Sequence, residues 1–325
     1  MKNPPEQRSA RAFGPVPSRC LGRSLGINNI PPKVCSYSCV YCQLGRTIAL
    51  EIERRSFYQP EEIQQDVLER VARARRLGEP IDYLTFVPDG EPTLDSNLGR
   101  EIELLRPLGI KIAVISNGSL VWREDVREEL GKADWVSLKV DAVREEPWRR
   151  INRPHPALRL GSILEGMRAF ARAYKGKLAT ETMLVRGLND GEEDLTEVAG
   201  FLAELEPSRA YLAVPTRPPA EGWVEPPDEE RINQAYQVLR EQLEHVELLI
   251  GYEGNAFAFT GNVEEDLLSI TAVHPLREEA VRELLAKAGA DWQVVRKLID
   301  ADRLVELEYR GRKFYMRQVG GRLGL

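Results

Sequence analysis

Residues 35–45 read CSYSCVYCQLG, and three of the four cysteines in the chain fall within this stretch. Cys35, Cys39 and Cys42 have the spacing C-x3-C-x2-C. A disulfide uses two cysteines, and a structural zinc site usually uses four ligands. Three thiolates can instead hold three of the irons of a [4Fe–4S] cluster, which leaves one iron open to a small ligand. The spacing therefore predicts an iron–sulfur site with one open position.

Two other interpretations of these thiols stay open. Cys20 is the fourth cysteine, and it is available as the additional ligand that a tetrahedral zinc site would need. The three cysteines can also simply lie near one another without binding a metal. The chain has three histidines, and none has a metal-ligand spacing; they are His155, His245 and His274.

Composition indicates an ordinary globular protein of 325 residues, with 42% hydrophobic and 30% charged residues. Its formal net charge of -6 gives no general attraction to nucleic acid, although a local basic patch is compatible with it. No apolar run reaches the roughly 18 residues of a membrane-spanning helix, and the polar start shows no secretory signal. We therefore expect a protein of the reducing cytoplasm with no membrane contact.

From about residue 60 onward, short apolar strands alternate with amphipathic helices. This alternation predicts parallel strands joined by right-handed helical crossovers, in either a doubly wound sheet or a barrel. The expected strands are 24–30, 83–87, 111–116, 135–140, 177–185 and 209–214. The expected helices are 61–77, 95–108, 123–133, 161–174, 191–205 and 228–245.

The C-terminal part has a different pattern. Residues 276–289 and 291–303 each carry an apolar helical stripe, and residues 304–318 alternate on both sides of Arg310-Gly311, which indicates a hairpin. Two helices followed by a hairpin predict a small winged-helix-like domain over residues 262–325. Its basic end, which includes Arg312 and Lys313, suits a nucleic-acid backbone, while a winged helix can equally bind a protein or only support the fold.

The cysteine loop, with Tyr41 just before its last cysteine, resembles the cluster loop of the radical S-adenosylmethionine (SAM) superfamily. Longer stretches resemble the branch of that superfamily related to wyosine-type tRNA modification, over nearly the whole chain. They are FGPVPSRCLGRSLGINNI from residue 13, DGEPTL at 89–94, GLND at 187–190 and GYEGNAFAFTGN from residue 251. The resemblance implies an α/β fold, with a partial (β/α)6 TIM-like barrel over residues 14–255.

The resemblance also implies the chemistry. The cofactors are a [4Fe–4S] cluster, held by the three cysteines of the loop, and SAM, whose amino and carboxylate groups chelate the open iron. An electron from the cluster cleaves SAM and yields a 5′-deoxyadenosyl radical, which abstracts hydrogen from a substrate. Such an enzyme needs an electron donor such as flavodoxin or ferredoxin.

Ligand-binding residues of such a barrel lie where its strands end. The resemblance places the glycine–glutamate motif of the family at Gly90 and Glu91, with Asp89 where a second glycine is common, and the backbone of Tyr41 against the adenine. Other polar residues at strand ends are expected to face SAM, although each also fits an ordinary turn, cap or rim charge. These residues are Ser116, Asn117, Lys139, Asp141 and Glu181, with Asn189 and Asp190 interpreted mainly as a turn and cap, and Pro215 as a wall beside the adenine.

The substrate is less well indicated. A basic loop suits a phosphate-bearing substrate, or is simply a solvated run of charge; it contains Arg149, Arg150, Arg153 and His155. Members of the branch that carry a second cluster have several extra N-terminal cysteines, and Cys20 alone cannot supply them. Cys20 is interpreted as a quiet buried thiol.

Three functional hypotheses follow. The first is a radical SAM enzyme acting on a tRNA or other RNA base. The second keeps this chemistry but acts on a protein or peptide. The third, of another class, is an iron–sulfur redox sensor that binds DNA through its winged helix. The atom attacked, the fate of SAM and the oligomeric state stay open.

Overall fold

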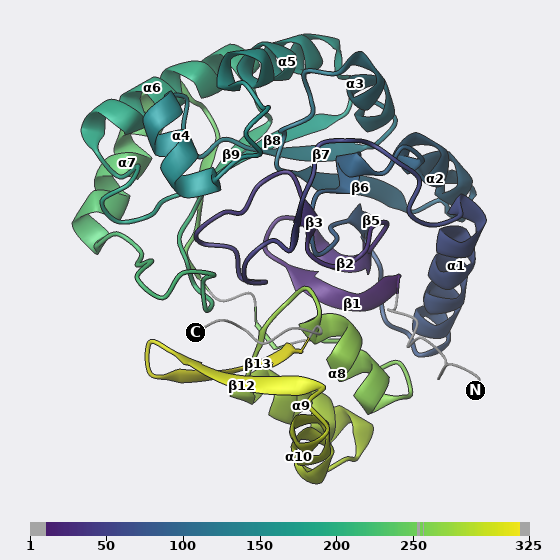
Figure 1. Cartoon of the computed structure of the whole chain (residues 1–325). Coiled ribbons are helices and arrows are strands. Elements are labelled where there is room, and N and C mark those ends of the chain that lie inside the picture. The colour runs from purple at the N-terminus through teal and green to yellow at the C-terminus, as the bar shows by residue number, and fades with distance from the viewer. Residues whose placement is uncertain (1–10, 252–253, 256, 319–325) are drawn as a thin grey trace.

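The computed structural model describes residues 11–251, 254, 255 and 257–318, and within them the largest sheet has eight strands (Figure 1). Their order is β1–β2–β5–β6–β7–β8–β9–β10. β1 pairs antiparallel with β2, and every other neighbouring pair in this sheet is parallel. The bounds are β1 Ala12–Ser18, β2 Gly22–Ile27, β5 Tyr83–Phe86, β6 Lys111–Ser116, β7 Trp135–Lys139, β8 Lys177–Met183, β9 Arg209–Ala213 and β10 Val246–Leu249.

The sheet curls into an open half-barrel, and helices cover its outer face (Figure 1). These helices are α1 Pro60–Arg76, α2 Leu98–Leu105, α3 Glu124–Leu130, α5 Leu160–Ala173, α6 Glu192–Leu205 and α7 Glu229–Gln242. A further helix, α4 Glu145–Asn152, and two single turns of 3-10 helix, Pro92–Leu94 and Arg106–Leu108, lie in the connections. No helix in the described part of the chain is both long and apolar enough to span a membrane.

α1 shows how the sequence produces this layer. Pro60 occupies the first turn, where its missing N–H costs nothing, and two glutamates follow it near the positive end of the helix dipole. Ile63, Val67 and Val71 recur at helical spacing and are at most 2% exposed. The helix ends before Gly78, which has a φ of 70°. The buried stripe is therefore what fixes α1 against the sheet.

The predicted alternation of strands and helices is confirmed, and so is the α/β fold with a partial barrel. The sequence analysis missed the antiparallel strand β1 and helix α4. The strand-like run LLIGY, which begins at Leu248 after the predicted helix 228–245, is confirmed in part by the parallel strand β10. β1 reads AFGPVPS, and its two prolines hide the strand pattern; proline is accepted there because β1 is at the edge of the sheet. The predicted helix 95–108 is shorter, because Asp95 accepts the N–H of Asn97 in a turn before α2 begins.

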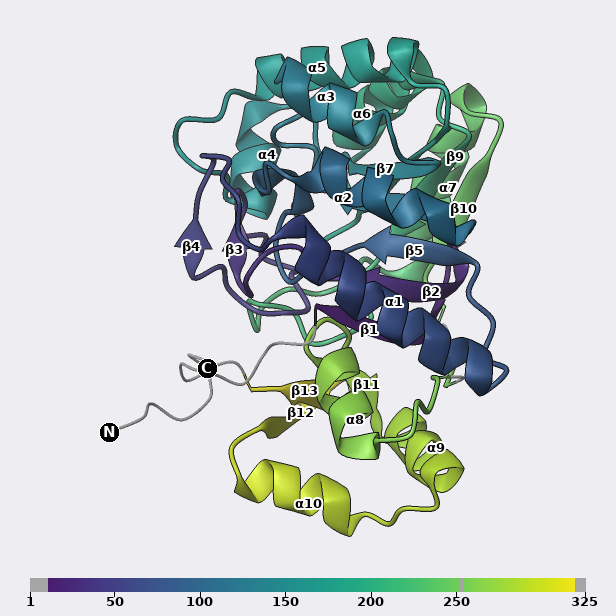
Figure 2. The ribbon, with the colours of Figure 1, turned by 90° about the vertical axis from the view of Figure 1, so that its right-hand side faces the viewer.

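The C-terminal residues form a second layer beneath β1 (Figures 1 and 2). The two predicted helices and the hairpin are present as α9 Glu278–Ala288, α10 Gln293–Asp300, β12 Leu304–Tyr309 and β13 Arg312–Arg317. Two elements were not predicted, α8 Val263–Thr271 and β11 Leu276–Arg277, which pairs with β13. The core of this unit includes Phe13 and Val16 of β1, so β1 packs on both the barrel and the C-terminal helices.

A buried ion pair ties α1 to α8. Arg70 and Asp266 are 5% and 1% exposed, and Arg70 Nη1 lies 3.0 Å from Asp266 Oδ1. Arg70 also donates to the hydroxyls of Thr260 and Ser269. The guanidinium is therefore fully engaged with the C-terminal unit.

Replacing Arg70 with alanine should lower the free energy of unfolding by about 3–5 kcal/mol, because Asp266 would keep its charge in the interior without a counter-ion. Denaturant unfolding of the cluster-loaded protein measures this effect. Arg100→Ala is the matched control: its pair with Glu61 is exposed on both sides, so about 0–1 kcal/mol is expected. Equal losses in the two variants would show that the buried pair has no special role.

A buried pair of acids lies behind the loop that follows β5. Asp95 and Glu101 are 0% and 1% exposed, and their carboxyl groups interact directly. Burial, followed by the charge of Asp95, raises the pKa of Glu101 well above its ordinary value. This shift favours a proton on the pair, which removes the repulsion between two buried carboxylates.

The proton on Glu101 makes stability depend on pH. Its pKa is higher in the folded than in the unfolded chain, so its contribution is complete below the unfolded value and declines as the pH rises toward the folded one. Glu101→Gln mimics the neutral acid. As the pH is raised from about 5 to about 8, the free energy of unfolding of this variant should fall less than that of the wild type. Urea unfolding across this range tests the prediction, which parallel pH profiles would refute.

Candidate functional site

The cysteine loop lies outside the main sheet, between two short strands at one end of the barrel (Figure 2). Cys35 ends β3 Val34–Cys35, which pairs in parallel with β4 Ala49–Leu50. The loop between them is held from several sides: the N–H of Ser38 donates to the carbonyl of Asn152, and the N–H of Val40 donates to that of Ile151. The backbone around the three cysteines is thus fixed by α4.

The three cysteines are each only partly exposed, and their thiols interact with one another electrostatically. Burial raises the pKa of all three, to about 12 for Cys39. Two of the sulfurs receive side-chain amide donors: Asn117 Nδ2 lies 3.5 Å from Cys35 Sγ, and Asn152 Nδ2 lies 3.5 Å from Cys39 Sγ. Amide donors aimed at cysteine sulfurs are a feature of iron–sulfur sites, where they tune the potential of the cluster.

The positions of the possible metal ligands argue against the zinc alternative. Among the described residues, no three His, Cys, Asp or Glu side chains converge closely enough to coordinate a single ion. Cys20 lies in the turn between β1 and β2, where it interacts with Tyr211. It lines one cavity with Trp135 and Lys177, which begin β7 and β8, and a second cavity with Glu181 and with Gln43 of the cysteine loop. Because no three possible ligands converge among the described residues, Cys20 does not complete a zinc site with the loop in this structure.

Glu91 organises the pocket beside the cysteines. The residue is 1% exposed. One oxygen accepts the hydroxyls of Ser116, at 2.7 Å, and Thr93, at 2.6 Å, together with the N–H of Thr93; the other accepts the N–H of Asn117 at 2.7 Å. Burial raises the pKa of Glu91, and these hydrogen bonds oppose that rise. The carboxylate thereby ties the end of β5 to the end of β6.

Gly90 joins this pocket to the cysteine loop. The Glu91 N–H donates to the Val34 carbonyl, and the Lys33 N–H donates to the Asp89 carbonyl. A Cβ on Gly90 would lie 1.9 Å from the Val34 oxygen. Glycine is required here because the two backbones pass so closely. The strand that carries Cys35 and the loop that carries Glu91 therefore move as one unit.

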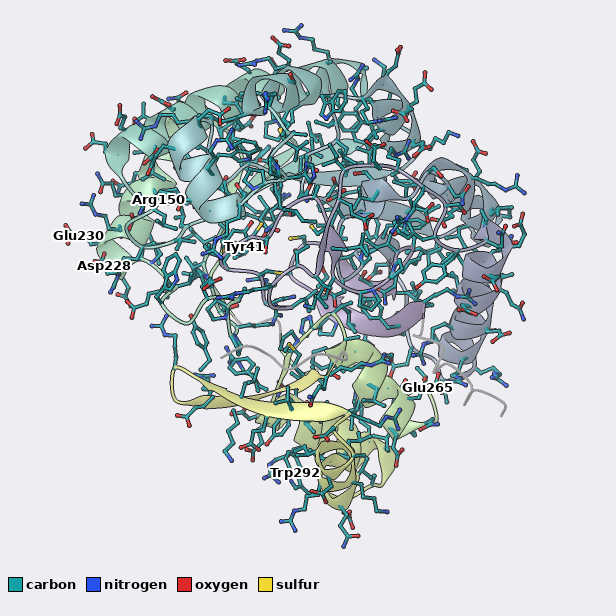
Figure 3. The ribbon with its side chains drawn as sticks, viewed as in Figure 1. Tyr41, Arg150, Asp228, Glu230, Glu265 and Trp292 are labelled. Carbon is teal, nitrogen blue, oxygen red and sulfur yellow. The ribbon has the colours of Figure 1, made fainter. Side chains whose placement is uncertain are left out.

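A second network surrounds Tyr41, which lies in the interior beside α4 (Figure 3). Its hydroxyl donates to Asp141, which also accepts from Asn152 at 2.7 Å and from the Met183 N–H at 2.8 Å. Burial raises the pKa of Asp141, while Lys139 and these donors oppose the rise. The Asn152 side chain contacts both Asp141 and Cys39, so the network reaches the cysteine loop.

Lys139 and Glu181 complete the set of predicted residues. They come from the adjacent strands β7 and β8, and Lys139 Nζ lies 2.6 Å from Glu181 Oε1. The ammonium also lies over the Tyr41 ring, 5.5 Å from its centre. Burial acts against the charges of this pair, but their mutual attraction leaves the pKa of Lys139 raised and that of Glu181 lowered. The structure thus places most of the predicted pocket residues at or near the carboxyl ends of β5–β8, while Tyr41 reaches them from the cysteine loop and Pro215 follows β9.

Comparison with known proteins agrees with this arrangement. The family model described as the radical SAM superfamily matches residues 29–199. The chain belongs to the radical SAM superfamily. It is 52% identical over 313 residues to a UPF0026 protein of Methanocaldococcus jannaschii, which covers 96% of this chain and 97% of that relative.

Solved structures show the same fold in other radical SAM proteins. The structure of TYW1 with a lysine–pyruvate adduct is 18% identical, covers 68% of this chain and 74% of that one, and gives a TM-score of 0.52. The structure of Streptococcus suis SuiB bound to precursor peptide SuiA is 15% identical. The match covers 70% of this chain and 49% of that one, with a TM-score of 0.51. As a radical SAM enzyme, the protein uses a [4Fe–4S] cluster and SAM, and three cysteines on one loop with amide donors are a donor set that fits this cluster.

In the structure, the arginines of the basic loop are paired with glutamates and do not form a free run of positive charge. Arg149 and Arg150 lie on α4 and pair with Glu145 and Glu146 one turn earlier. Arg153 pairs with Glu221, which is distant in sequence.

Pro215 accepts a hydrogen bond from Tyr309 through its carbonyl. Asn189 does not cap α6, but binds the backbone of Asp141 and Val185.

Sequence reasoning missed several residues of the site, which are Asn152, Ser36, Ser119 and Thr93. Asn152 is 2% exposed and ends α4, a helix that the sequence analysis did not predict. Ser36 and Ser119 hydrogen-bond each other at 2.5 Å behind Cys35. The only signal for Asn152 was Pro154 two positions later, which marks the end of a helix.

Proposed function

We propose that Cys35, Cys39 and Cys42 hold the [4Fe–4S] cluster and that SAM binds above it, at the carboxyl ends of β5–β8. The bound pair supplies reductive cleavage of SAM to a 5′-deoxyadenosyl radical, which abstracts hydrogen from a substrate. The observation that carries this proposal is the direct connection between the cysteine strand and the Gly90–Glu91 loop. This connection fixes the cluster ligands relative to the expected SAM pocket.

The pocket residues take different roles in this proposal. Glu91 accepts four protein hydrogen bonds, three at one oxygen and one at the other, so we assign it to positioning Ser116 and Asn117, with the second oxygen able to accept from the SAM ammonium. Gly90 permits the close approach of the backbone. The other charged or polar side chains expected to contact SAM are Tyr41, Asn117, Lys139, Asp141 and Glu181.

We propose two domains, a barrel over residues 14–255 and a winged-helix-like domain over residues 262–325. The second domain helps to present the substrate. Residues 319–325, with Arg322 of the basic end, lie outside the described residues. The enzyme also needs a reductant of the flavodoxin or ferredoxin kind. The basic loop does not separate the two substrate classes, because its exposed pairs, Arg149–Glu145 and Arg150–Glu146, are each worth only about 0–1 kcal/mol. The sensor hypothesis loses its basis, since the chain belongs to an enzyme superfamily.

The proposed chemistry is tested by incubating the anaerobically reconstituted protein with dithionite and SAM. We expect 5′-deoxyadenosine and methionine in equal amounts, measured by liquid chromatography and mass spectrometry. A fully loaded cluster that yields neither product would contradict the proposal.

A further inference from the structure

A groove of about 450 Å³ leads from the surface to the cysteine loop. Three segments line it: residues 43–48 of the cysteine loop, residues 218–220 and 222 of the proline-rich loop, and residues 307–309 and 316–318 of the β12–β13 hairpin. We call this the hairpin groove. Its size is within the range of ligand sites, and the barrel and the C-terminal unit each supply part of its walls.

The walls of the hairpin groove are mainly apolar. Pro218, Pro219 and Leu307 line it, together with Met316. Ile48 lies at the groove with 70% of its surface exposed, although it is a large apolar side chain. Exposed apolar surface in a concave site is typical of a binding surface.

Two of the cations that line the groove, Arg46 and Lys33, are paired with protein carboxylates. Arg46 donates to both oxygens of Glu221, at 2.9 and 3.0 Å, and Arg153 pairs with the same residue. Lys33 Nζ lies 3.3 Å from Asp89 Oδ1. Arg317 also lines the groove, and the charge of Arg303 acts on it, while Glu308 places a carboxylate along the same wall. A polyphosphate chain would therefore have to displace the ion pairs of Lys33 and Arg46 and approach the carboxylates of Asp89 and Glu308.

Asp89 supplies the polar feature that points to a ligand. It lines the groove, is 6% exposed, and its Oδ2 has no hydrogen-bond partner among the described residues. A buried carboxylate oxygen without a donor is costly, and a donor from a bound ligand would remove that cost. Asp89 and Lys33 also lie near enough to Cys42 to interact with it electrostatically, so this acceptor lies beside the proposed cluster.

We propose that the hairpin groove binds an extended polypeptide segment of the substrate, with apolar side chains against Ile48 and the prolines and a lysine side chain donating to Asp89 Oδ2. This inference rests on the proposed function, because it places the substrate chain next to the cluster. It selects a polypeptide over RNA through the apolar walls, the pairing of Lys33 and Arg46 with carboxylates, and the carboxylate oxygen of Asp89 that has no donor. Asp89 occupies the position at which a second glycine is common in the family.

The test uses the full-length protein loaded with cluster and SAM, and three probes: a pool of apolar heptapeptides with a central lysine, the same pool with norleucine in place of lysine, and unfractionated tRNA. Fluorescence anisotropy under anaerobic conditions should show preferential binding of the lysine pool. Ile48→Glu should weaken that binding by roughly tenfold or more. Leu68→Glu is the matched control, since Leu68 is 43% exposed on α1 and does not line the groove, and it should bind like the wild type.

Asp89→Asn separates the role of the carboxylate from that of the walls. It should remove most of the preference for lysine over norleucine while leaving the affinity for SAM within about twofold. A loss of SAM affinity with an unchanged lysine preference would overturn the proposal and assign Asp89 to SAM. Binding of tRNA in place of either peptide pool would also overturn it.

Failure of this inference is distinguishable from failure of the proposed chemistry. Wild-type protein that forms 5′-deoxyadenosine from SAM but binds neither peptide pool would refute the peptide groove alone. Peptide binding without any cleavage of SAM would instead refute the radical chemistry.

Discussion

Cys39→Ser should lose the iron–sulfur cluster and, with it, reductive cleavage of SAM. Cys39 lies in the middle of the loop, and Asn152 directs an amide N–H at its sulfur. Serine keeps the size of the side chain but replaces a thiolate, the preferred ligand of iron in clusters, with a poor one. Iron and sulfide analysis of anaerobically reconstituted protein should show a large deficit, and 5′-deoxyadenosine formation should fall by more than about 100-fold.

Cys20→Ser is the control for this prediction. Cys20 lies in the turn between β1 and β2, outside the cysteine loop, and interacts with Tyr211, so its removal should leave the iron content unchanged. If Cys20→Ser loses the metal while Cys39→Ser retains it, the assignment of the cluster to the loop is wrong.

Gly90→Ala should disrupt the site through the backbone. The new Cβ would lie 1.9 Å from the Val34 oxygen and 2.7 Å from Ile30 Cδ1, so β3 and the loop after β5 would have to separate. This separation would break the hydrogen bonds that connect the strand of Cys35 with the loop of Glu91. We expect a loss of stability of about 3 kcal/mol or more, incomplete cluster loading and no measurable binding of SAM.

Gly109→Ala separates packing from backbone strain. Gly109 has a φ of 68°, which alanine also disfavours, but a Cβ there meets no atom within 4 Å. It should cost only about 1 kcal/mol and leave SAM binding intact. The comparison uses urea unfolding and equilibrium binding of SAM, and equal effects of the two substitutions would show that the contact with Val34 is unimportant.

The sequence was sufficient to predict the parts of this protein that depend on local pattern. The cysteine spacing indicated an open iron–sulfur site, and the alternation of strands and helices indicated the parallel sheet. Residues at strand ends, such as Ser116 and Lys139, could be placed at one edge because parallel strands share their direction. Their actual partners were beyond such reasoning, since Lys139 meets Glu181 from a neighbouring strand.

Tertiary pairing explains most of what the sequence could not reveal. Arg153 appeared as part of a solvated basic run, yet its partner Glu221 is 68 positions away. Asn152 had no motif around it, and only the fold brings it to Cys39 and Asp141. Strand β1 was hidden because proline-rich sequence is acceptable at the edge of a sheet, where fewer backbone N–H groups are needed.

The central claim is that one iron of the cluster lacks a protein thiolate and binds SAM. Mössbauer spectroscopy of the anaerobically prepared, iron-57-labelled protein tests it most directly. We predict a [4Fe–4S] spectrum in which a single iron site changes its parameters when SAM is added, while the three sites bound by cysteine keep theirs. A spectrum that SAM leaves unaltered, or a preparation that contains zinc in place of iron, would contradict the claim.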